Sequence, residues 1–512
     1  MLSDDQTPNS LINRPVFRQV IIIGAGTAGL SAAYQLKKSG FKNVLILEGQ
    51  DRVGGRILTN YLDDSFSKPL DMGACWIHGL ENNPVYELVQ REQFPSHTGT
   101  ILTYDIGMCV DENGNEIPNS LHVEVDQFFE SLAQDIRDLF QLDSINNNQT
   151  SLVDKRLISE SFQKVFSEKF QKFLNLNGGD GETRRLKLKL LQRRFDQETG
   201  ECGCNSMDQV SHYEFGSYQR PKGPDLEFPC GYGSLIRYLR SLIPENWLCF
   251  EKFVENISWY NNDQRIKIEC ATGERYECDH CIVTIPLACL KWNYKSLFTP
   301  ALPAWKTEAI HKLDMGTVDK IYLFYDNLDF IKGDSLAIIY DKDDNIDIKK
   351  EWYKKIFLFM KVYDNVLLGW ITGDEAIYCE DLDETYIGDV LTNVLRKSLK
   401  NSSIPKPNKV IRTQWFSNPC SRGSYSYVPV GATSKQHIKD LSRPLYVNNV
   451  PKLLFAGEAT HKNYYSTVHG AYITGQQQAE NLIKFIKNDE KLARQSAKDM
   501  LTKVIFDISE PP

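Results

Sequence analysis

The sequence VIIIGAGTAG, at residues 20–29, places a glycine-rich turn directly after an apolar run. A helical pattern follows at residues 30–38, and a second apolar run, VLIL, occupies residues 44–47. Strand, turn, helix and strand in this order form a βαβ unit, which builds a parallel sheet. The stretch therefore predicts an α/β fold that begins with a nucleotide-binding type of unit.

The glycines of this turn have the spacing G-x-G-x-x-G, which suits a dinucleotide pyrophosphate. In that motif Gly24 makes the tight turn, Gly26 lets the pyrophosphate approach, and Gly29 lets helix and strand pack closely. Ala25 belongs to the same cradle, and the helix N-terminus turns partial positive charge toward the phosphates. Glu48 follows Gly29 by 19 residues, the spacing of an acid that accepts ribose hydroxyls. A glycine turn without a ligand is the alternative that this context disfavours.

Composition narrows the class of protein. The chain has 512 residues, 41% of them apolar, which suits about two to four domains and excludes a disordered chain. The net charge of −8 argues against a nucleic-acid partner. The first residues are too polar for a secretory signal, and no apolar run approaches the ~20 residues of a membrane span. We therefore expect a soluble cytoplasmic protein with reduced cysteines and no membrane partner.

Further elements follow along the chain. Residues 120–191 have a helical pattern, residues 196–224 are polar with scattered glycines and predict a loop, and residues 228–242 open another helix. A long helix is expected to start near His469. Strand-like runs occupy residues 266–270, 280–285, 320–325 and 452–456.

Several motifs together carry a resemblance to a known family. They are DRVGGR at residues 51–56, GACWIHG at 73–79, SRGSYSY at 421–427, LFAGEATH at 454–461 and YSTVHGA at 465–471. In content and in order along the chain they resemble the flavin-containing amine oxidases. Within that family they are most similar to the polyamine oxidase branch, which includes spermine oxidase and N1-acetylpolyamine oxidase.

The resemblance implies an α/β amine oxidase fold of two domains. A Rossmann-like FAD-binding domain would comprise residues 15–100, 225–300 and 410–490. An α+β substrate-binding domain with a mixed sheet would comprise residues 101–224 and 301–409. Members with covalent flavin carry a cysteine in the stretch that corresponds to residues 421–427, where this chain has Ser424 and no cysteine. We therefore expect FAD to be held noncovalently.

The resemblance also assigns residues to the cofactor. Arg56 would be a second phosphate clamp, with a surface arginine as the alternative. Glu458 would lie at the riboflavin side, and a helix N-terminus near His469 would stabilise negative charge on the flavin ring. The other residues expected to bind the cofactor are Gly73, Ala74, Trp76, Val254, Gly457, Ser466, Thr467 and Val468.

Two residues are expected to take part in catalysis. Lys320 matches the lysine that bridges through water to the flavin in the family, although a lone lysine at a strand start is usually structural. His78 matches a histidine that positions the substrate amine, with a hydrogen-bonded core histidine as the alternative. No metal is expected, because the cysteines and histidine of residues 278–281 lie in a strand and lack a second half-site.

Further residues are expected to bind the substrate. Glu201 resembles an acid of a spermine oxidase loop, yet Gly203 replaces the serine that follows there, so the preference for free or acetylated polyamine stays open. A solvated loop acid is the alternative for Glu201. Tyr425, Tyr427 and Thr467 would line the substrate path, where aromatic rings guide an amine by cation–π contact. Aromatic core packing is the alternative for the tyrosines.

The function that follows is oxidation of a polyamine at a secondary amine, with O2 as acceptor. The products would be an aldehyde, a shorter polyamine and H2O2. The sequence leaves open whether the substrate is spermine or N1-acetylated spermine or spermidine, and which C–N bond is cut. It also leaves open whether the protein is a monomer or a weak oligomer. The alternatives are a histone lysine demethylase-like or other amine oxidase of the same fold, or a flavin-binding protein without turnover.

Overall fold

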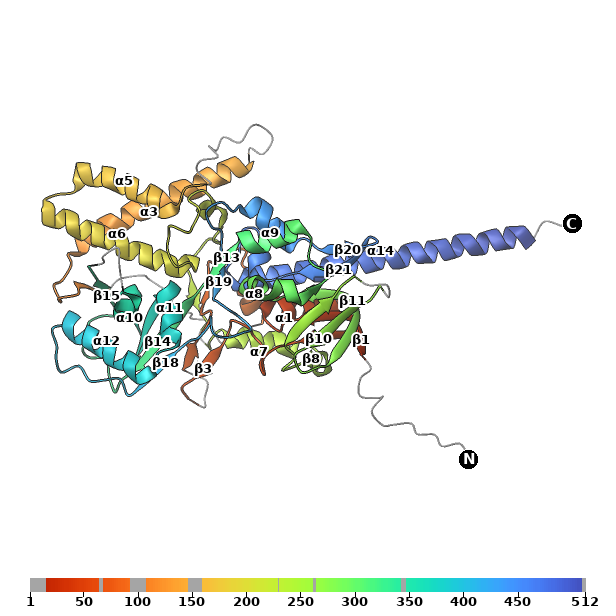
Figure 1. Cartoon of the computed structure of the whole chain (residues 1–512), viewed down its shortest axis with the longest axis horizontal. Helices are drawn as coiled ribbons and strands as arrows, with labels where there is room; N and C mark the ends of the chain where they lie inside the picture. Colours follow the sequence, from red (N-terminus) through yellow and green to blue (C-terminus); the bar gives the residue numbers. More distant parts are fainter. Residues whose placement is uncertain are drawn as a thin grey trace, which may run out of the picture.

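The fold is described by a computed structural model, which covers residues 15–63, 68–92, 107–145, 159–228, 230–260, 264–341 and 347–508. Two large β-sheets form its centre. Helices α3 (Asn119–Ile145), α5 (Phe162–Asn177) and α6 (Gly181–Cys202) lie together at one end, and α14 (Val468–Ile508) extends away from the body at the other (Figure 1).

The first sheet has nine strands and contains the predicted βαβ unit. Its order is β12-β9-β10-β11-β1-β2-β8, and β21 pairs with β11 and β20. The strands are β1 (Val16–Ile23), β2 (Val44–Leu47), β8 (Leu248–Cys249), β9 (Val254–Ser258), β10 (Ile266–Cys270), β11 (Arg275–Val283), β12 (Phe298–Thr299), β20 (Leu445–Val447) and β21 (Val450–Phe455).

The parallel strands β21, β11, β1 and β2 set the position of the site. In register, Ile23 of β1 pairs with Leu47 of β2 and with Val283 of β11, and Val283 pairs with Phe455 of β21. The four carboxyl ends therefore meet at one edge, where open α/β sheets bind their ligands. The segments that leave this edge start at Gly24, Glu48, Thr284 and Ala456.

Helices cover both faces of the parallel strands. Residues 20–23 of β1 are all buried, as expected of a parallel strand covered on both sides. Helix α1 (Thr27–Lys38) packs against α14, and the Ser31 hydroxyl donates to the Tyr472 carbonyl at 2.9 Å. A Cβ on Gly475 would lie 2.1 Å from the Ala28 carbonyl oxygen, so only glycine permits this close crossing.

The second sheet has six strands in the order β18-β14-β17-β16-β15-β6. Its strands are antiparallel except for the parallel pair β15–β6, so the sheet is mixed. Helices α11 (Gly373–Glu380) and α12 (Glu384–Ser398) accompany it. The strands are β6 (Met108–Asp111), β14 (Val318–Phe324), β15 (Ser335–Ile339), β16 (Phe359–Tyr363), β17 (Val366–Thr372) and β18 (Lys409–Arg412).

Helices α3, α5 and α6 confirm the helical region predicted at residues 120–191, of which residues 146–158 lie outside the described part, but the loop predicted from residue 196 is wrong at its start. Helix α6 continues to Cys202 and ends at Gly203, whose φ of 70° is the left-handed conformation that favours glycine. Its last turns are polar yet buried, because Arg194 forms ion pairs with carboxylates of the same region. Polar composition there reflects a buried ionic cluster rather than a loop.

Shorter elements complete the described chain. The remaining strands are β3 (Thr59–Tyr61), β4 (Pro69–Asp71), β5 (Trp76–Ile77), β7 (Leu226–Glu227), β13 (Asp314–Gly316) and β19 (Tyr425–Tyr427). The remaining helices are α2 (Pro84–Arg91), α7 (Gly233–Ser241), α8 (Leu287–Leu297), α9 (Ala304–Lys312), α10 (Ile348–Glu351) and α13 (Lys439–Ser442), with short 3₁₀ or π turns at Glu214–Ser217, Glu245–Trp247, Trp352–Lys355, Ser434–Ile438 and Glu458–Thr460.

Within the described residues, none of the helices combines the length and apolar character that crossing a membrane requires. In the same residues, no three His, Cys, Asp or Glu side chains gather in a group that could hold a metal ion. None of the twelve cysteines, all of which lie in the described residues, forms a disulfide.

Candidate functional site

One large cavity joins the edge of the parallel strands to the second sheet. Its volume is about 1850 Å³, well above the roughly 300–1,000 Å³ of a pocket for one drug-sized ligand. The predicted site residues that line it are Gly24, Gly26, Glu48, Arg56, Gly73, Ala74, Trp76, His78, Glu201, Val254, Lys320, Tyr425, Tyr427, Gly457, Glu458, Ser466, Thr467 and Val468. Ala25 and Gly29 are not part of the lining.

The glycine turn has the geometry of a phosphate cradle. Gly24 has a φ of 101°, which favours glycine, and a Cβ on Gly29 would lie 1.9 Å from the Gly24 carbonyl oxygen. A Cβ on Gly26, by contrast, would meet nothing within 4 Å. Gly26 thus borders open space in the cavity, whereas Gly29 is required for packing of the turn.

Glu48 is held at the rim of this cradle by backbone donors. The Ala25 N–H donates to Oε2 at 2.6 Å, and the Gln50 N–H donates to Oε1 at 2.9 Å. Burial raises the pKa of Glu48, and the N–H groups of Ala25 and Gln50 oppose that effect. The carboxylate is therefore oriented while it lines the cavity, as an acceptor for hydroxyl groups must be.

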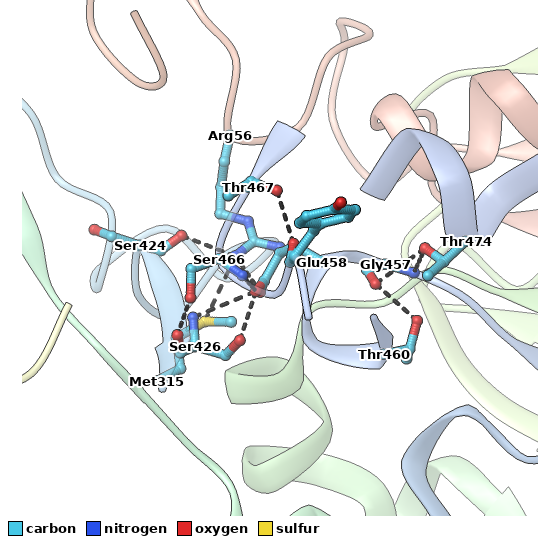
Figure 2. A network of polar contacts seen from close by, with 11 residues as sticks. Arg56, Met315, Ser424, Ser426, Gly457, Glu458, Thr460, Ser466, Thr467 and Thr474 are labelled. Carbon is cyan, nitrogen blue, oxygen red and sulfur yellow. Dashed lines mark hydrogen bonds and ion pairs between the residues drawn. The ribbon is translucent and has the colours of Figure 1, made fainter. Parts of the chain in front are cut away.

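Arg56 and Glu458 form a buried network on the other side of the cradle (Figure 2). Arg56 Nη1 lies 2.9 Å from Glu458 Oε1 and donates to the Ser424 carbonyl at 2.8 Å. Glu458 Oε2 accepts from the Ser426 hydroxyl at 2.6 Å and from the Ser466 N–H at 2.8 Å. This network ties residues 421–427 to the start of α14.

Helix α14 points its N-terminus at the cavity. The Thr467 hydroxyl accepts from the Gly470 N–H at 3.0 Å and donates to the Tyr464 carbonyl at 2.7 Å, which caps the helix. Thr467 and Val468 line the cavity, so the positive end of the helix dipole faces the space beyond them. A Cβ on Gly457 would also meet nothing within 4 Å. Gly26 and Gly457 thus leave space beside the backbone, the Glu48 carboxylate is held in one orientation, and the N-terminus of α14 faces the cavity. These features together fit a dinucleotide cofactor.

Lys320 lies in the wall of the cavity on β14. Its Nζ donates to the carbonyls of Asp71 at 2.6 Å and Gly73 at 2.8 Å and lies 4.5 Å from the ring centroid of Trp370. Trp370 is the register partner of Lys320 on β17, and antiparallel partners present their side chains on one face. Trp76 lies 5.3 Å from Trp370, centroid to centroid. The Nζ atom of Lys320 is therefore fixed beside the Trp370 ring, which in turn contacts Trp76.

The groups next to Lys320 have shifted pKa values. Burial raises the pKa of the Asp71 carboxyl to about 6, although Thr59 and Lys320 oppose that rise. Burial likewise raises the pKa of the Cys75 thiol to about 11, so it is protonated at neutral pH. Lys320 therefore lies close to groups that lose protons less readily than usual.

His78 lies beside Trp76, with 6.3 Å between the ring centroids, and beside Asp225, which precedes strand β7. Strand β5 pairs antiparallel with β7, which brings His78 next to Asp225, and Nδ1 lies 3.1 Å from Asp225 Oδ2. Asp225 Oδ1 accepts from Gly79 N–H at 2.9 Å and pairs with Arg220 at 2.7 Å. Despite burial, these partners lower the pKa of Asp225. An ionised Asp225 orients the imidazole and leaves Nε2 for a ligand.

Glu201 lies in the last turn of α6 with Glu198. Its Oε1 is 4.0 Å from Arg194 Nη1, and its side chain is 46% exposed. Glu198 is buried and pairs with Arg194 at 3.0 Å. Burial, and then the like charge of Glu201, raises the pKa of Glu198 to about 7. A cationic ligand bound beside Glu198 and Glu201 would relieve the like charge between their carboxyl groups.

The hydroxyl groups of the two predicted tyrosines contact other groups of the protein. Tyr425 donates to the Gly200 carbonyl, and the Tyr427 hydroxyl contacts Gln209 and Asp314 at 3.2 Å each. Both residues line the cavity, so their rings are the parts that face it. Tyr425 and Tyr427 are therefore both packed within the protein and part of the cavity wall.

Sequence reasoning missed Asp225, Trp370 and Glu198. None of them lies in a recognisable motif, because each reaches the site through strand pairing or a helix turn. A strand ending in an acid, as at residues 225–227, is too common a pattern to single out Asp225.

Comparisons with known proteins place the chain in a family. Residues 27–483 match the family described as flavin containing amine oxidoreductase. The human peroxisomal N(1)-acetyl-spermine/spermidine oxidase is 31% identical over 93% of this chain and 97% of its own, and the Arabidopsis thaliana probable polyamine oxidase 5 is 30% identical over 92% and 98%.

A solved structure of a redesigned putrescine oxidase has the same fold. It superposes with a TM-score of 0.67 and 17% identity, over 92% of this chain and 100% of the other. The predicted fold class is confirmed by this likeness and by the family match. By the extent of that match, the chain belongs to the flavin containing amine oxidoreductases.

Proposed function

We propose that the protein is a polyamine oxidase that holds FAD noncovalently. It would oxidise a secondary amine of spermine or of an N1-acetylated polyamine and release an aldehyde, a shorter polyamine and H2O2. The observation that carries the proposal is the continuity of the cavity, which joins the phosphate cradle to Lys320, His78 and the acidic wall of α6. Relatives of about 30% identity that are named as polyamine oxidases support it.

The residues proposed to bind the cofactor lie at the phosphate cradle and along the cavity that continues from it. Gly24, Gly26 and Glu48 would hold the pyrophosphate and the ribose, and the end of β9 at Val254 would meet the adenine. The N-terminus of α14 would face the flavin ring, together with Gly457 and Ser466. The run at residues 421–427 contains no cysteine, and the Ser424 hydroxyl is engaged with Val318, which supports a noncovalent flavin.

The chemistry divides between cofactor and chain. When bound, the flavin would supply the acceptor for a hydride from the carbon next to the amine and the route of the electrons to O2. The reacting amine must be neutral, because its lone pair assists departure of the hydride. His78 would accept or donate a hydrogen bond to that amine through Nε2, and Lys320 would hold a water molecule for proton transfer.

The acidic wall would bind the rest of the substrate. A polyamine carries several ammonium groups, and Glu198 and Glu201 present carboxylates on one helix turn, close to the aromatic rings of Tyr425 and Tyr427. Charge and aromatic faces together suit a long cation. The reacting nitrogen would thereby be placed between His78 and the flavin ring.

A peroxide assay tests the proposal. Purified protein should be yellow and should release H2O2 with spermine, spermidine or their N1-acetyl forms, and the initial rates will rank them. Yellow protein without peroxide from any polyamine would indicate a flavin-binding protein without turnover. Peroxide from a methylated-lysine peptide alone would indicate a demethylase-like enzyme. Colourless protein that cannot be reconstituted with FAD would refute the proposal.

Replacing His78 by alanine should lower kcat/KM at least about 10-fold, the size of one hydrogen bond to an amine of ~1.5 kcal/mol. Flavin content should stay unchanged, because His78 is proposed to contact the substrate amine and not the cofactor. Steady-state rates measure kcat/KM, and the flavin absorbance measures the flavin content. The matched control is His311→Ala on α9, outside the cavity. Equal kcat/KM in the two variants would rule out a role for His78 in binding the amine.

Replacing Glu201 by glutamine should raise KM for spermine only about two- to five-fold. A partly exposed ion pair contributes at most ~1 kcal/mol, and Glu201 is 46% exposed. The rise should shrink as salt concentration increases. Glu182→Gln, at the exposed start of the same helix, serves as the control. A KM that is unchanged at low salt would mean that Glu201 does not contact the substrate.

A further inference from the structure

Two carboxyl groups are buried together behind Lys320. Asp319 and Glu380 are 2% and 1% exposed. Asp319 precedes Lys320 on β14, so their side chains point to opposite faces of the sheet. Among the residues that the structure describes, no lysine, arginine or histidine forms an ion pair with either carboxyl group. Two buried carboxylates without a cation cannot both stay charged at low cost.

The hydrogen bonds show which of the two carries charge. Glu380 Oε1 accepts from the Phe416 N–H at 2.7 Å. Glu380 Oε2 accepts from the Ser417 N–H at 2.7 Å and also from the Ser417 hydroxyl. Both oxygens of Glu380 therefore act as acceptors, which is the requirement of an ionised carboxylate.

Asp319 differs, because only one of its oxygens has a donor. Oδ1 accepts from the Thr413 hydroxyl at 2.6 Å and from the Trp415 N–H at 3.3 Å. Oδ2 is buried, and within the described part of the chain no group donates to it. The carboxyl group of Asp319 also interacts with that of Glu380, which is another acceptor. Such a contact is favourable only with a proton between the two groups.

We propose that Asp319 is a carboxylic acid that donates its Oδ2 proton to ionised Glu380, and that this pair positions Lys320. The pair joins β14, the end of α11 and residues 413–417. The part of the proposal that concerns Lys320 rests on the catalytic role proposed for that residue. The shared proton itself is independent of that role.

Two paths lead from the pair to Lys320. The Lys320 N–H donates to the Thr413 hydroxyl at 2.9 Å, and this hydroxyl in turn donates to Asp319. On the other side, the Trp415 indole donates to the Met72 carbonyl at 3.1 Å. Met72 lies between the two residues whose carbonyls accept from Lys320 Nζ. The pair thus fixes both the backbone of Lys320 and the acceptors of its ammonium group.

The titratable surroundings of the pair are few. Cys379 is buried beside both carboxyl groups, and burial raises the pKa of its thiol, so it is neutral. Arg412 faces the Cys379 carbonyl, to which its Nε donates at 2.9 Å. Burial, and then the like charge of Glu380, raises the pKa of Asp319. A raised pKa means that the stabilisation is present at low pH and is lost as pH rises through it.

The test compares Asp319→Asn with Glu380→Gln. An asparagine keeps an acceptor for Thr413 and Trp415 and supplies an N–H donor to Glu380, as the protonated acid does. A glutamine at 380 turns its NH2 group toward the N–H of Phe416 or Ser417, which leaves donors facing one another. Asp319→Asn should therefore keep the wild-type Tm, whereas Glu380→Gln should lower it. Equal tolerance of both, or the reverse order, would overturn the assignment of the proton.

A pH series separates the shared proton from a general structural role. The Tm of the wild type, measured without cofactor, should fall as pH rises from the ordinary pKa of an aspartic acid, 3.8, toward the raised pKa of Asp319, and this fall should be absent or shallower in Asp319→Asn. The same fall in both proteins would overturn the proposal. In peroxide assays, Asp319→Ala should lower kcat more than it raises KM, and Asp319→Asn should restore kcat. A wild-type kcat in Asp319→Ala would overturn only the part of the proposal in which the pair positions Lys320. The shared proton is tested by the Tm measurements.

Discussion

Replacing Lys320 by methionine should lower kcat about 10²-fold or more while the protein keeps its flavin. Positioned proton transfer contributes roughly 10²–10⁴-fold to catalysis, and Lys320 supplies the ammonium group of this wall. Methionine fills a similar volume against Trp370 but removes the ammonium donor from the carbonyls of Asp71 and Gly73, of which Asp71 keeps the Tyr322 hydroxyl. Steady-state peroxide release and the flavin absorbance of the purified variant measure the two effects.

The matched control is Lys361→Met, which removes another lysine of the same cavity from β16. Its kcat should stay close to that of the wild type. Rates that fall equally in both variants would indicate a general loss of cavity charge. Unaltered turnover in Lys320→Met would refute the proposed catalytic role.

Replacing Gly26 by alanine should abolish most flavin binding without unfolding the protein. A Cβ at this position meets no protein atom within 4 Å, and its φ of −73° suits alanine. The added methyl group would instead occupy the space in which a pyrophosphate approaches the turn. We expect affinity for FAD to fall at least about 10-fold, since a lost close contact with a charged group costs ~1.5 kcal/mol or more.

Gly29→Ala provides the contrast on the same turn. Its Cβ would lie 1.9 Å from a backbone oxygen, so the turn must move, and overpacking of this kind costs about 1–3 kcal/mol or more. The Tm of the cofactor-free protein should fall in Gly29→Ala and stay unchanged in Gly26→Ala. Titration with FAD then isolates binding from folding. Wild-type affinity in a folded Gly26→Ala protein would place the cofactor elsewhere.

Local patterns account for the parts of the fold that were predicted. A buried apolar run, glycines at fixed spacing and an acid after the second strand specify the βαβ unit, because backbone conformation and side-chain period depend on neighbouring residues. The long helix near His469 and the strand before it were equally visible. The end of α6 was not, because the ion pairs of Arg194 bury polar residues that composition assigns to a loop.

By itself, then, the sequence determined the α/β class, the phosphate cradle and, through its motifs, the family. The tertiary structure decided which side chains surround the reacting groups. Asp225 meets His78 across 147 residues, and Trp370 meets Lys320 because two antiparallel strands share one register. Asp319 and Glu380 likewise join only when β14 packs against α11. Such contacts depend on strand register and packing between distant segments, which no local pattern of residues specifies.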